Sequence, residues 1–126
     1  MKKIFLMLII AVNITACSND DLCFYIENVN EHIEQATIKV EVNDIKVLES
    51  KFDYSNITHH YEKFNYPVGK EERVKLTITN VECGAKYEDS INVKNQNQIF
   101  VEFVNNEKIN DCDFIVGYSD SPTKIR

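Results

Sequence analysis

The feature that most constrains the fold of this chain is the alternation of apolar and polar residues in short stretches. Two stretches, 37–42 and 73–79, place an apolar side chain at every second position. Successive side chains of a β-strand point to opposite faces, so this period predicts strands with one buried face. The expected inward residues are Ile38, Val40 and Val42 in the first stretch and Val74, Leu76 and Ile78 in the second.

Further β-rich stretches follow one another along the chain, separated by short polar turns. They are 22–26, 45–54, 58–66, 87–93, 98–104 and 114–118. The pair Asn43-Asp44 predicts a tight hairpin, because both residues tolerate left-handed turn geometry. The stretch 98–104 is apolar on nearly both faces, which is typical of a central strand. Seven or eight short strands predict an all-β fold, an antiparallel β-sandwich.

The order of strands and turns also resembles that of small immunoglobulin-like and carbohydrate-module-like sandwiches. The chain contains no Trp, so it lacks the Cys…Trp…Cys core of antibody-type domains. The resemblance implies a two-layer, immunoglobulin-like arrangement of the strands and nothing about a specific ligand.

Residues 1–16 have the composition of a secretory signal peptide. Lys2 and Lys3 precede an uninterrupted apolar run from Ile4 to Val12. Such a run rises about 14 Å as a helix, far less than the ~30 Å of a bilayer core. We therefore expect a cleaved leader and not a transmembrane helix. Its removal takes away both lysines and changes the formal net charge from −6 to −8.

The end of this leader, Ile14-Thr15-Ala16-Cys17, resembles the lipobox of bacterial lipoproteins. The resemblance implies cleavage before Cys17, a diacylglycerol on its sulfur and anchoring in the bacterial envelope. Ser18 beside the cysteine is similar to an outer-membrane sorting signal. Residues 17–21 would then be a polar tether, 22–118 the β-sandwich domain and 119–126 a polar C-terminal tail. The alternative is an ordinary signal peptide whose Cys17 later forms a disulfide.

The remaining cysteines predict one disulfide. If Cys17 carries lipid, Cys23, Cys83 and Cys112 are left in an oxidising compartment, and three thiols allow one bridge. Cys83 and Cys112 both lie near loop ends, which favours a bridge between them, although the two other pairings stay open. Cys23 lies in an apolar stretch, where a leftover buried thiol would behave as a small hydrophobic residue.

The sequence offers little evidence for catalysis or for a cofactor. The net charge of −6 argues against nucleic-acid binding, which needs clustered Lys and Arg. His59 and His60 are adjacent, so on a strand they point to opposite faces and cannot share a metal ion unless the backbone bends. The acidic C-terminal region around Asp113 lacks a calcium-loop pattern. We expect no enzyme activity, no cofactor and no metal.

Aromatic residues supply the candidate binding surface. Tyr54, Tyr61 and Tyr66 lie close together in the sequence and could contact a sugar or a protein, although aromatic residues are also common in strand cores. We therefore expect a lipid-anchored, non-catalytic binding or scaffold module for an envelope protein or glycan. The alternative is a periplasmic inhibitor or immunity-type protein, whose negative charge would steer it to a basic enzyme.

Overall fold

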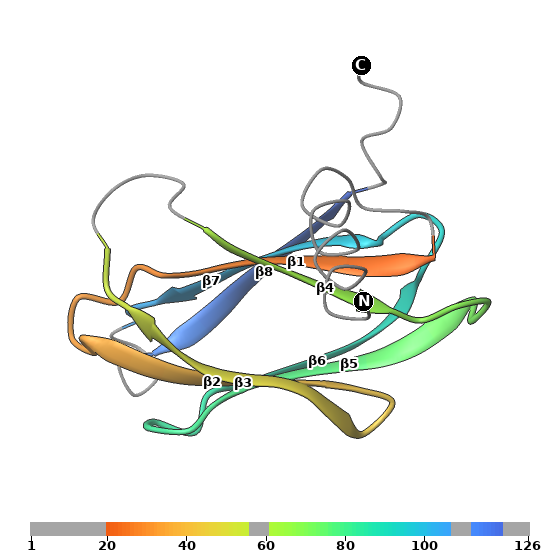
Figure 1. Cartoon of the computed structure of the whole chain (residues 1–126). Helices are drawn as coiled ribbons and strands as arrows, with labels where there is room; N and C mark the ends of the chain where they lie inside the picture. Colours follow the sequence, from red (N-terminus) through yellow and green to blue (C-terminus); the bar gives the residue numbers. More distant parts are fainter. Residues whose placement is uncertain (1–19, 56–60, 107–111, 120–126) are drawn as a thin grey trace, which may run out of the picture.

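The computed structural model describes residues 20–55, 61–106 and 112–119 and contains eight β-strands (Figure 1). The strands are β1 (Asp21–Asn28), β2 (Gln35–Val42), β3 (Ile45–Asp53), β4 (Glu62–Pro67), β5 (Arg73–Asn80), β6 (Lys86–Asn92), β7 (Gln98–Val104) and β8 (Asp113–Ser119). Each of the eight stretches predicted from the sequence contains one of these β-strands. The expected stretch 58–66 differs most, because β4 begins at Glu62 and residues 56–60 lie outside the described part.

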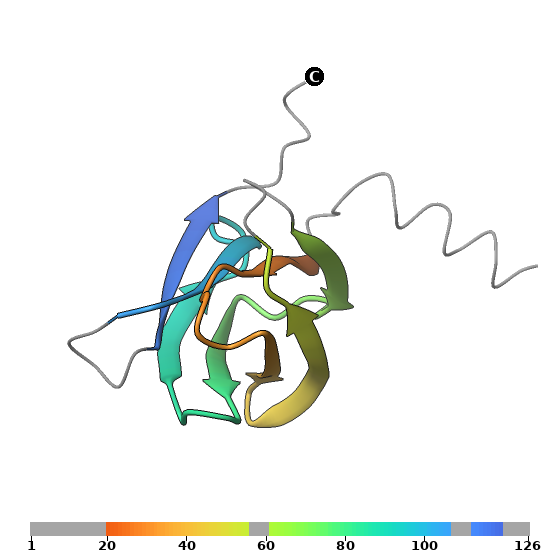
Figure 2. The same cartoon turned by 90° about the vertical axis from the view of Figure 1, so that its left-hand side faces the viewer.

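The eight strands form two layers of four. Sheet A has the order β4-β1-β7-β8 and sheet B the order β3-β2-β5-β6. All neighbouring strands are antiparallel except β1 and β7, which run parallel. The predicted all-β sandwich is therefore confirmed, as is the central place of β7. Figure 2 shows β8 and β4 at opposite sides of the molecule, at the two edges of sheet A.

The immunoglobulin-like resemblance extends to the two-layer architecture but not to the strand order. In immunoglobulin constant-type domains the first strand shares a sheet with the second, fourth and fifth. Here β1 lies between β4 and β7, and β2 belongs to the opposite sheet. The chain changes sheet after β1, β3, β4 and β6, so residues far apart in the sequence become neighbours.

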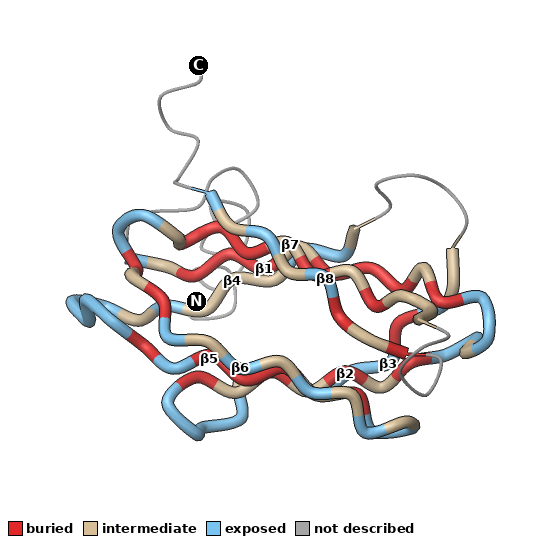
Figure 3. The backbone as a smooth tube through the Cα atoms, turned by 180° about the vertical axis from the view of Figure 1, so that it is seen from behind, coloured by how far each residue is buried: buried red, intermediate tan, exposed pale blue. Residues whose placement is uncertain are grey.

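The core lies between the inner faces of the two sheets, where buried segments face one another in Figure 3. The alternation that predicted the strands accounts for it: one side chain in two is turned into this layer. The inner residues of both alternating stretches are buried as predicted, together with side chains from the other strands. The largest fully buried side chains include Phe24, Phe103, Leu22, Ile26, Leu76 and Ile91.

The hairpin between β2 and β3 follows from its two turn residues. Asn43 and Asp44 have φ angles of 53° and 68°, as the predicted turn requires. The Asn43 side chain accepts a hydrogen bond of 2.9 Å from the Lys75 backbone N–H, which ties the turn to β5. At the same end of the sandwich, the Asp20 carbonyl accepts hydrogen bonds from the Val68 and Gly69 N–H groups. The chain thus enters the fold at the end that carries the β2–β3 and β4–β5 turns.

Candidate functional site

The outer face of sheet A carries a row of side chains that crosses three strands. Strand register places Tyr25 of β1 beside Lys63 of β4 on one side and Phe100 of β7 on the other. The Tyr25 and Phe100 rings stack, with centroids 4.8 Å apart and planes at 15°. The Lys63 Nζ lies 5.6 Å from the centroid of the Tyr25 ring, within the range of a cation–π contact. We call Lys63, Tyr25 and Phe100 the aromatic row.

Tyr61, the residue directly before β4, adds a third ring to this cluster. Its ring meets the rings of Tyr25 and Phe100 edge-on, at centroid distances of 6.3 Å and 5.9 Å. Partial burial raises the pKa of the Tyr61 hydroxyl, and the negative charges of Glu27 and Glu102 raise it further. The Tyr61 hydroxyl is therefore a neutral group in an acidic setting, able to donate a hydrogen bond.

Two hydrogen bonds in series fix the hydroxyl end of the Tyr25 side chain. The Gln98 side-chain amide donates to the Tyr25 hydroxyl at 3.2 Å, and the Ser119 hydroxyl donates to the Gln98 amide oxygen at 2.9 Å. Burial raises the pKa of Tyr25, and the bond from Gln98 opposes that shift. This chain of contacts crosses β1, β7 and β8, so it holds the Tyr25 ring in one orientation.

The three tyrosines predicted from the sequence do not form one surface. Tyr61 lies on the outer face of sheet A, whereas Tyr66 lies opposite Leu22 on the inner face and packs against the core. Tyr54 follows β3, where its backbone N–H donates to the Glu34 carbonyl at 2.7 Å. Tyr61 and Tyr66 therefore lie on opposite faces of sheet A.

Sequence reasoning missed Tyr25 and Phe100 as surface residues. Tyr25 occupies an outward position in a stretch that is otherwise buried, and Phe100 does the same in β7. An outward aromatic residue in a central strand is the signal that could have found them. Their contact with each other depends on the parallel pairing of β1 with β7, which no local pattern predicts.

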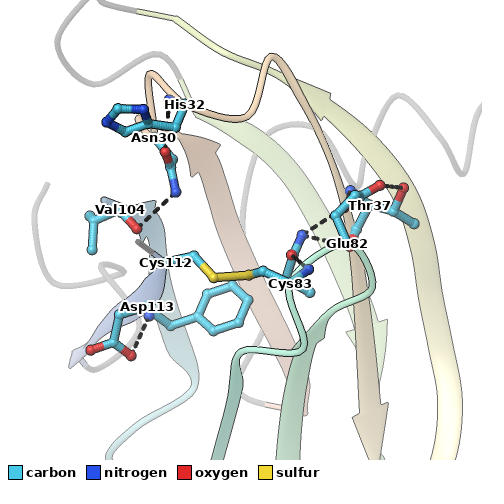
Figure 4. The surroundings of a disulfide bond; sticks show 10 residues. Asn30, His32, Thr37, Glu82, Cys83, Val104, Cys112 and Asp113 are labelled. Carbon is cyan, nitrogen blue, oxygen red and sulfur yellow. Dashed lines mark hydrogen bonds between the residues drawn. A yellow bond between two sulfur atoms is a disulfide. The ribbon is translucent and has the colours of Figure 1, made fainter. Parts of the chain in front are cut away.

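The disulfide between Cys83 and Cys112 is confirmed (Figure 4). It joins the β5–β6 turn of sheet B to the residue before β8 of sheet A, with Cα atoms 6.8 Å apart. The neighbouring Glu82 carboxylate accepts hydrogen bonds from the Thr37 backbone and hydroxyl and from the Asn80 amide. The disulfide and the Glu82 carboxylate together pin the β5–β6 turn to β2 and to the other sheet.

The expectation of a leftover thiol at Cys23 is wrong, because Cys23 is also disulfide-bonded. The side chain lies on the outer face of sheet A and is fully buried. The prediction of a leftover thiol depends on lipid at Cys17, which leaves an odd number of cysteines. Cys17 itself lies outside the described residues, as do His59 and His60.

A hollow of about 210 Å³ opens beside the edge formed by β3 and β4. Three carboxylates line it: Glu27 of β1, Asp53 of β3 and Glu62 of β4. Tyr54 also lines it, so one of the predicted tyrosines borders an acidic hollow and not the aromatic row. Within the described ranges, no group of three or more His, Cys, Asp or Glu side chains is arranged to hold a metal ion.

The chain matches no family model, no curated protein and no solved structure. Among the residues that the structure covers, no helix is long and apolar enough to span a bilayer. We therefore argue a function from the aromatic row and the acidic hollow.

Proposed function

We propose that the protein is a lipid-anchored, non-catalytic binding module of the bacterial envelope, whose ligand contacts the outer face of sheet A. The lipobox-like sequence at 14–17 supports the anchor. A cysteine at position 17 lies three residues before Asp20, a reach of at most about 11 Å. The end of the sandwich at which β1 begins would therefore lie next to the membrane, with the outer face of sheet A extending away from it.

The observation that carries the binding role is the aromatic row. The outer sides of sheets are usually polar, yet on this one two stacked, half-buried aromatic rings, a third half-buried ring and an exposed lysine gather. Rigid aromatic side chains lose little entropy on binding and give a large contact area, which is why binding surfaces use them. An envelope protein or glycan is the ligand class that such a surface and such an anchor serve together.

The anchor is tested by the mass and the location of the mature chain. We expect the protein from a bacterial host to fractionate with membranes, begin at Cys17 and carry diacylglycerol, and we expect Cys17→Ser to release it. A sulfur in a lipid thioether cannot also form a disulfide. The chain has four cysteines and Cys83 pairs with Cys112, so lipid on Cys17 and a disulfide at Cys23 exclude each other within one chain. A soluble mature chain with two internal disulfides and no lipid would therefore overturn the anchor.

The binding role is tested with envelope fractions from the same host. Phe100→Ser removes one wall of the aromatic row, whereas Ile45→Ser changes an exposed apolar side chain on sheet B and serves as the matched control. We expect the control to retain every envelope component that the unmodified protein retains and Phe100→Ser to lose it, with both variants folded by circular dichroism. Equal retention by both variants would contradict the role of this face.

The acidic hollow favours a second candidate, an inhibitor of a basic enzyme. Glu27, Asp53 and Glu62 concentrate negative charge at one place, and such a surface accelerates encounter with a cationic partner. This candidate predicts that Asp53→Lys with Glu62→Lys abolishes binding and that Phe100→Ser leaves it unchanged. The opposite pattern supports the aromatic row.

A further inference from the structure

The aromatic row ends at a glycine. The residue paired with Phe100 on the side away from Tyr25 is Gly117 of β8. A Cβ atom built on Gly117 would meet no heavy atom within 4 Å, and its backbone does not need a positive φ. Because the rings of Tyr25 and Phe100 are nearly parallel, one face of Phe100 is covered by Tyr25 and the other is turned toward the space above Gly117.

The spacing of the two existing rings suits one more ring above Gly117. Neighbouring strands in a sheet lie about 4.8 Å apart, and the Tyr25 and Phe100 centroids have the same separation. A ring placed above Gly117 would therefore continue the stack at the same interval, with Phe100 on one side and the β8 backbone beneath it. The other side is open, because β8 is the edge strand of sheet A. We call this space the Gly117 slot.

The residues around the slot are both apolar and polar. Ile115 and Ser119 flank Gly117 along the outer face of β8, and Ile115 is 57% exposed. Glu102 pairs with Ile115 and Gln98 pairs with Ser119, so both are diagonal neighbours of Gly117 on the same face. A ligand in the slot would meet a ring face, an aliphatic side chain, a carboxylate and a hydroxyl.

We propose that the Gly117 slot binds the pyranose ring of an N-acetylated hexosamine unit of a glycan. The C–H groups of the sugar lie on the negative face of Phe100 and the acetamido methyl contacts Ile115. The sugar hydroxyls donate hydrogen bonds to the Glu102 carboxylate and to the Ser119 oxygen, whose own proton is donated to Gln98. An aromatic side chain of a protein partner would fill the same space but would place an apolar edge against Glu102 and Ser119. The mixed lining therefore favours the sugar. This inference rests on the proposed function and specifies its ligand.

The slot can be closed without harming the fold. Gly117→Val adds a side chain where nothing obstructs it, and a β-branched residue suits a strand better than glycine. We expect this variant to keep or raise the thermal midpoint while losing the ligand, a combination that unfolding cannot produce. Ser90→Val makes a comparable change at an exposed position of β6 on the other sheet and is the control.

The test is a titration of the ¹⁵N-labelled full chain, held in a phosphocholine detergent that contains no sugar. The probes are the tetramer of N-acetylglucosamine, the tetramer of glucose and N-acetyltyrosinamide. We expect only the first to shift the amide signals of Ile115 and Gly117, with a Kd of about 1 mM. Gly117→Val should weaken that binding at least about tenfold, or 1.4 kcal/mol, and Ser90→Val should not.

Three results of the titration with the unmodified protein would overturn the inference. They are the absence of any shift at about 10 mM of the acetylated tetramer, an equal response to both tetramers, or a response to N-acetyltyrosinamide alone. Sugar binding that survives Gly117→Val would also overturn the slot but would leave the proposed binding function intact. The envelope-fraction experiment with Phe100→Ser tests that function separately.

Discussion

The Tyr118 hydroxyl of β8 donates a hydrogen bond of 3.0 Å to the Asp89 carboxylate of β6, and this contact joins the two sheets at one edge of the sandwich. Tyr87 lies in the same group, with its hydroxyl 2.6 Å from that of Tyr118 and 3.2 Å from the Asp89 carboxylate. The register pairs Asp89 with Leu76, whose side chain is in the core, so this carboxylate faces the space between the layers. A polar group of three residues thus closes the edge that β6 and β8 form.

Removing the Tyr118 hydroxyl should weaken this edge. Tyr118→Phe keeps the ring and deletes both hydrogen bonds of the hydroxyl, so we expect a loss of about 1 kcal/mol of unfolding free energy. Urea unfolding followed by circular dichroism measures the change. Asp89→Asn and the double variant complete a cycle that isolates the Tyr118–Asp89 coupling. Unchanged stability in Tyr118→Phe would show that the contact with Asp89 contributes nothing.

The same group predicts a loss of stability in alkali. Burial raises the pKa of Tyr118, and the neighbouring Tyr87 hydroxyl and Asp89 charge raise it further. Above pH ~10 the unfolded chain releases the Tyr118 proton while the folded chain retains it, so the unfolding free energy falls as pH rises. Below that pH both states hold the proton and the group adds no pH dependence. Unfolding curves from pH 9 to 11 should therefore show a shallower decline in Tyr118→Phe than in the unmodified protein.

Local patterns predicted the strands well because burial of one sheet face leaves a period of two in the sequence. Val74, Leu76 and Ile78 are buried as that period requires, and Asn43-Asp44 forms the expected turn. The candidate surface was harder to predict because it depends on which strands become neighbours. Tyr25 meets Phe100 and Lys63 only because β1 lies between β7 and β4.

The pairing of the cysteines is also only partly predictable from local sequence patterns. Loop-end positions favoured Cys83 with Cys112, and the structure contains that bridge. The sequence predicts a leftover thiol at Cys23, which is disulfide-bonded, because that prediction assigns Cys17 to lipid. Likewise, closeness in the sequence grouped Tyr54 with Tyr66, although a chain that leaves β3 for the other sheet separates them.

The Glu82 carboxylate should make the fold sensitive to acid. Burial acts to raise its pKa, but the hydrogen bonds from Thr37, from Asn80 and from its own backbone outweigh this and lower the pKa below the ordinary 4.5. A lowered pKa in the folded state adds stability above pH ~4.5 that is lost as pH falls further. Because Glu82 is exposed, we expect the effect at neutral pH to stay below about 1 kcal/mol.

Glu82→Gln tests this carboxylate. We expect the variant to be less stable than the unmodified protein at pH 7 and to approach it at pH 3, since the protonated carboxyl of the unmodified protein has also lost its charge. Glu88→Gln, which removes a carboxylate in an exposed ion pair with Lys86 on β6, is the control for the loss of a surface charge. Parallel stability curves for Glu82→Gln and the unmodified protein would contradict the role assigned to Glu82.

Loss of the Cys83–Cys112 disulfide should be the most destabilising of these changes. The bridge joins two residues that are 29 positions apart in the sequence. For a loop of this length, the lost chain entropy of the unfolded state alone stabilises the fold by about 3.5 kcal/mol. It also ties the β5–β6 turn to the start of β8, next to the edge held by Tyr118 and Asp89. We expect Cys83→Ala with Cys112→Ala to lower the urea midpoint strongly while the far-ultraviolet spectrum remains that of a β-protein.

The control for this change separates the bridge from the packing around it. Cys112 is buried, so part of any loss comes from the cavity that alanine leaves, and the unmodified protein reduced under native conditions loses the bridge without that cavity. Reduction also opens the disulfide at Cys23, so the reduced double variant is the proper reference for the reduced unmodified protein. We expect the reduced double variant and the reduced unmodified protein to have nearly the same free energy of unfolding. If the two reduced proteins differ as much as the two oxidised ones, the stabilisation comes from packing at Cys112 and not from the cross-link.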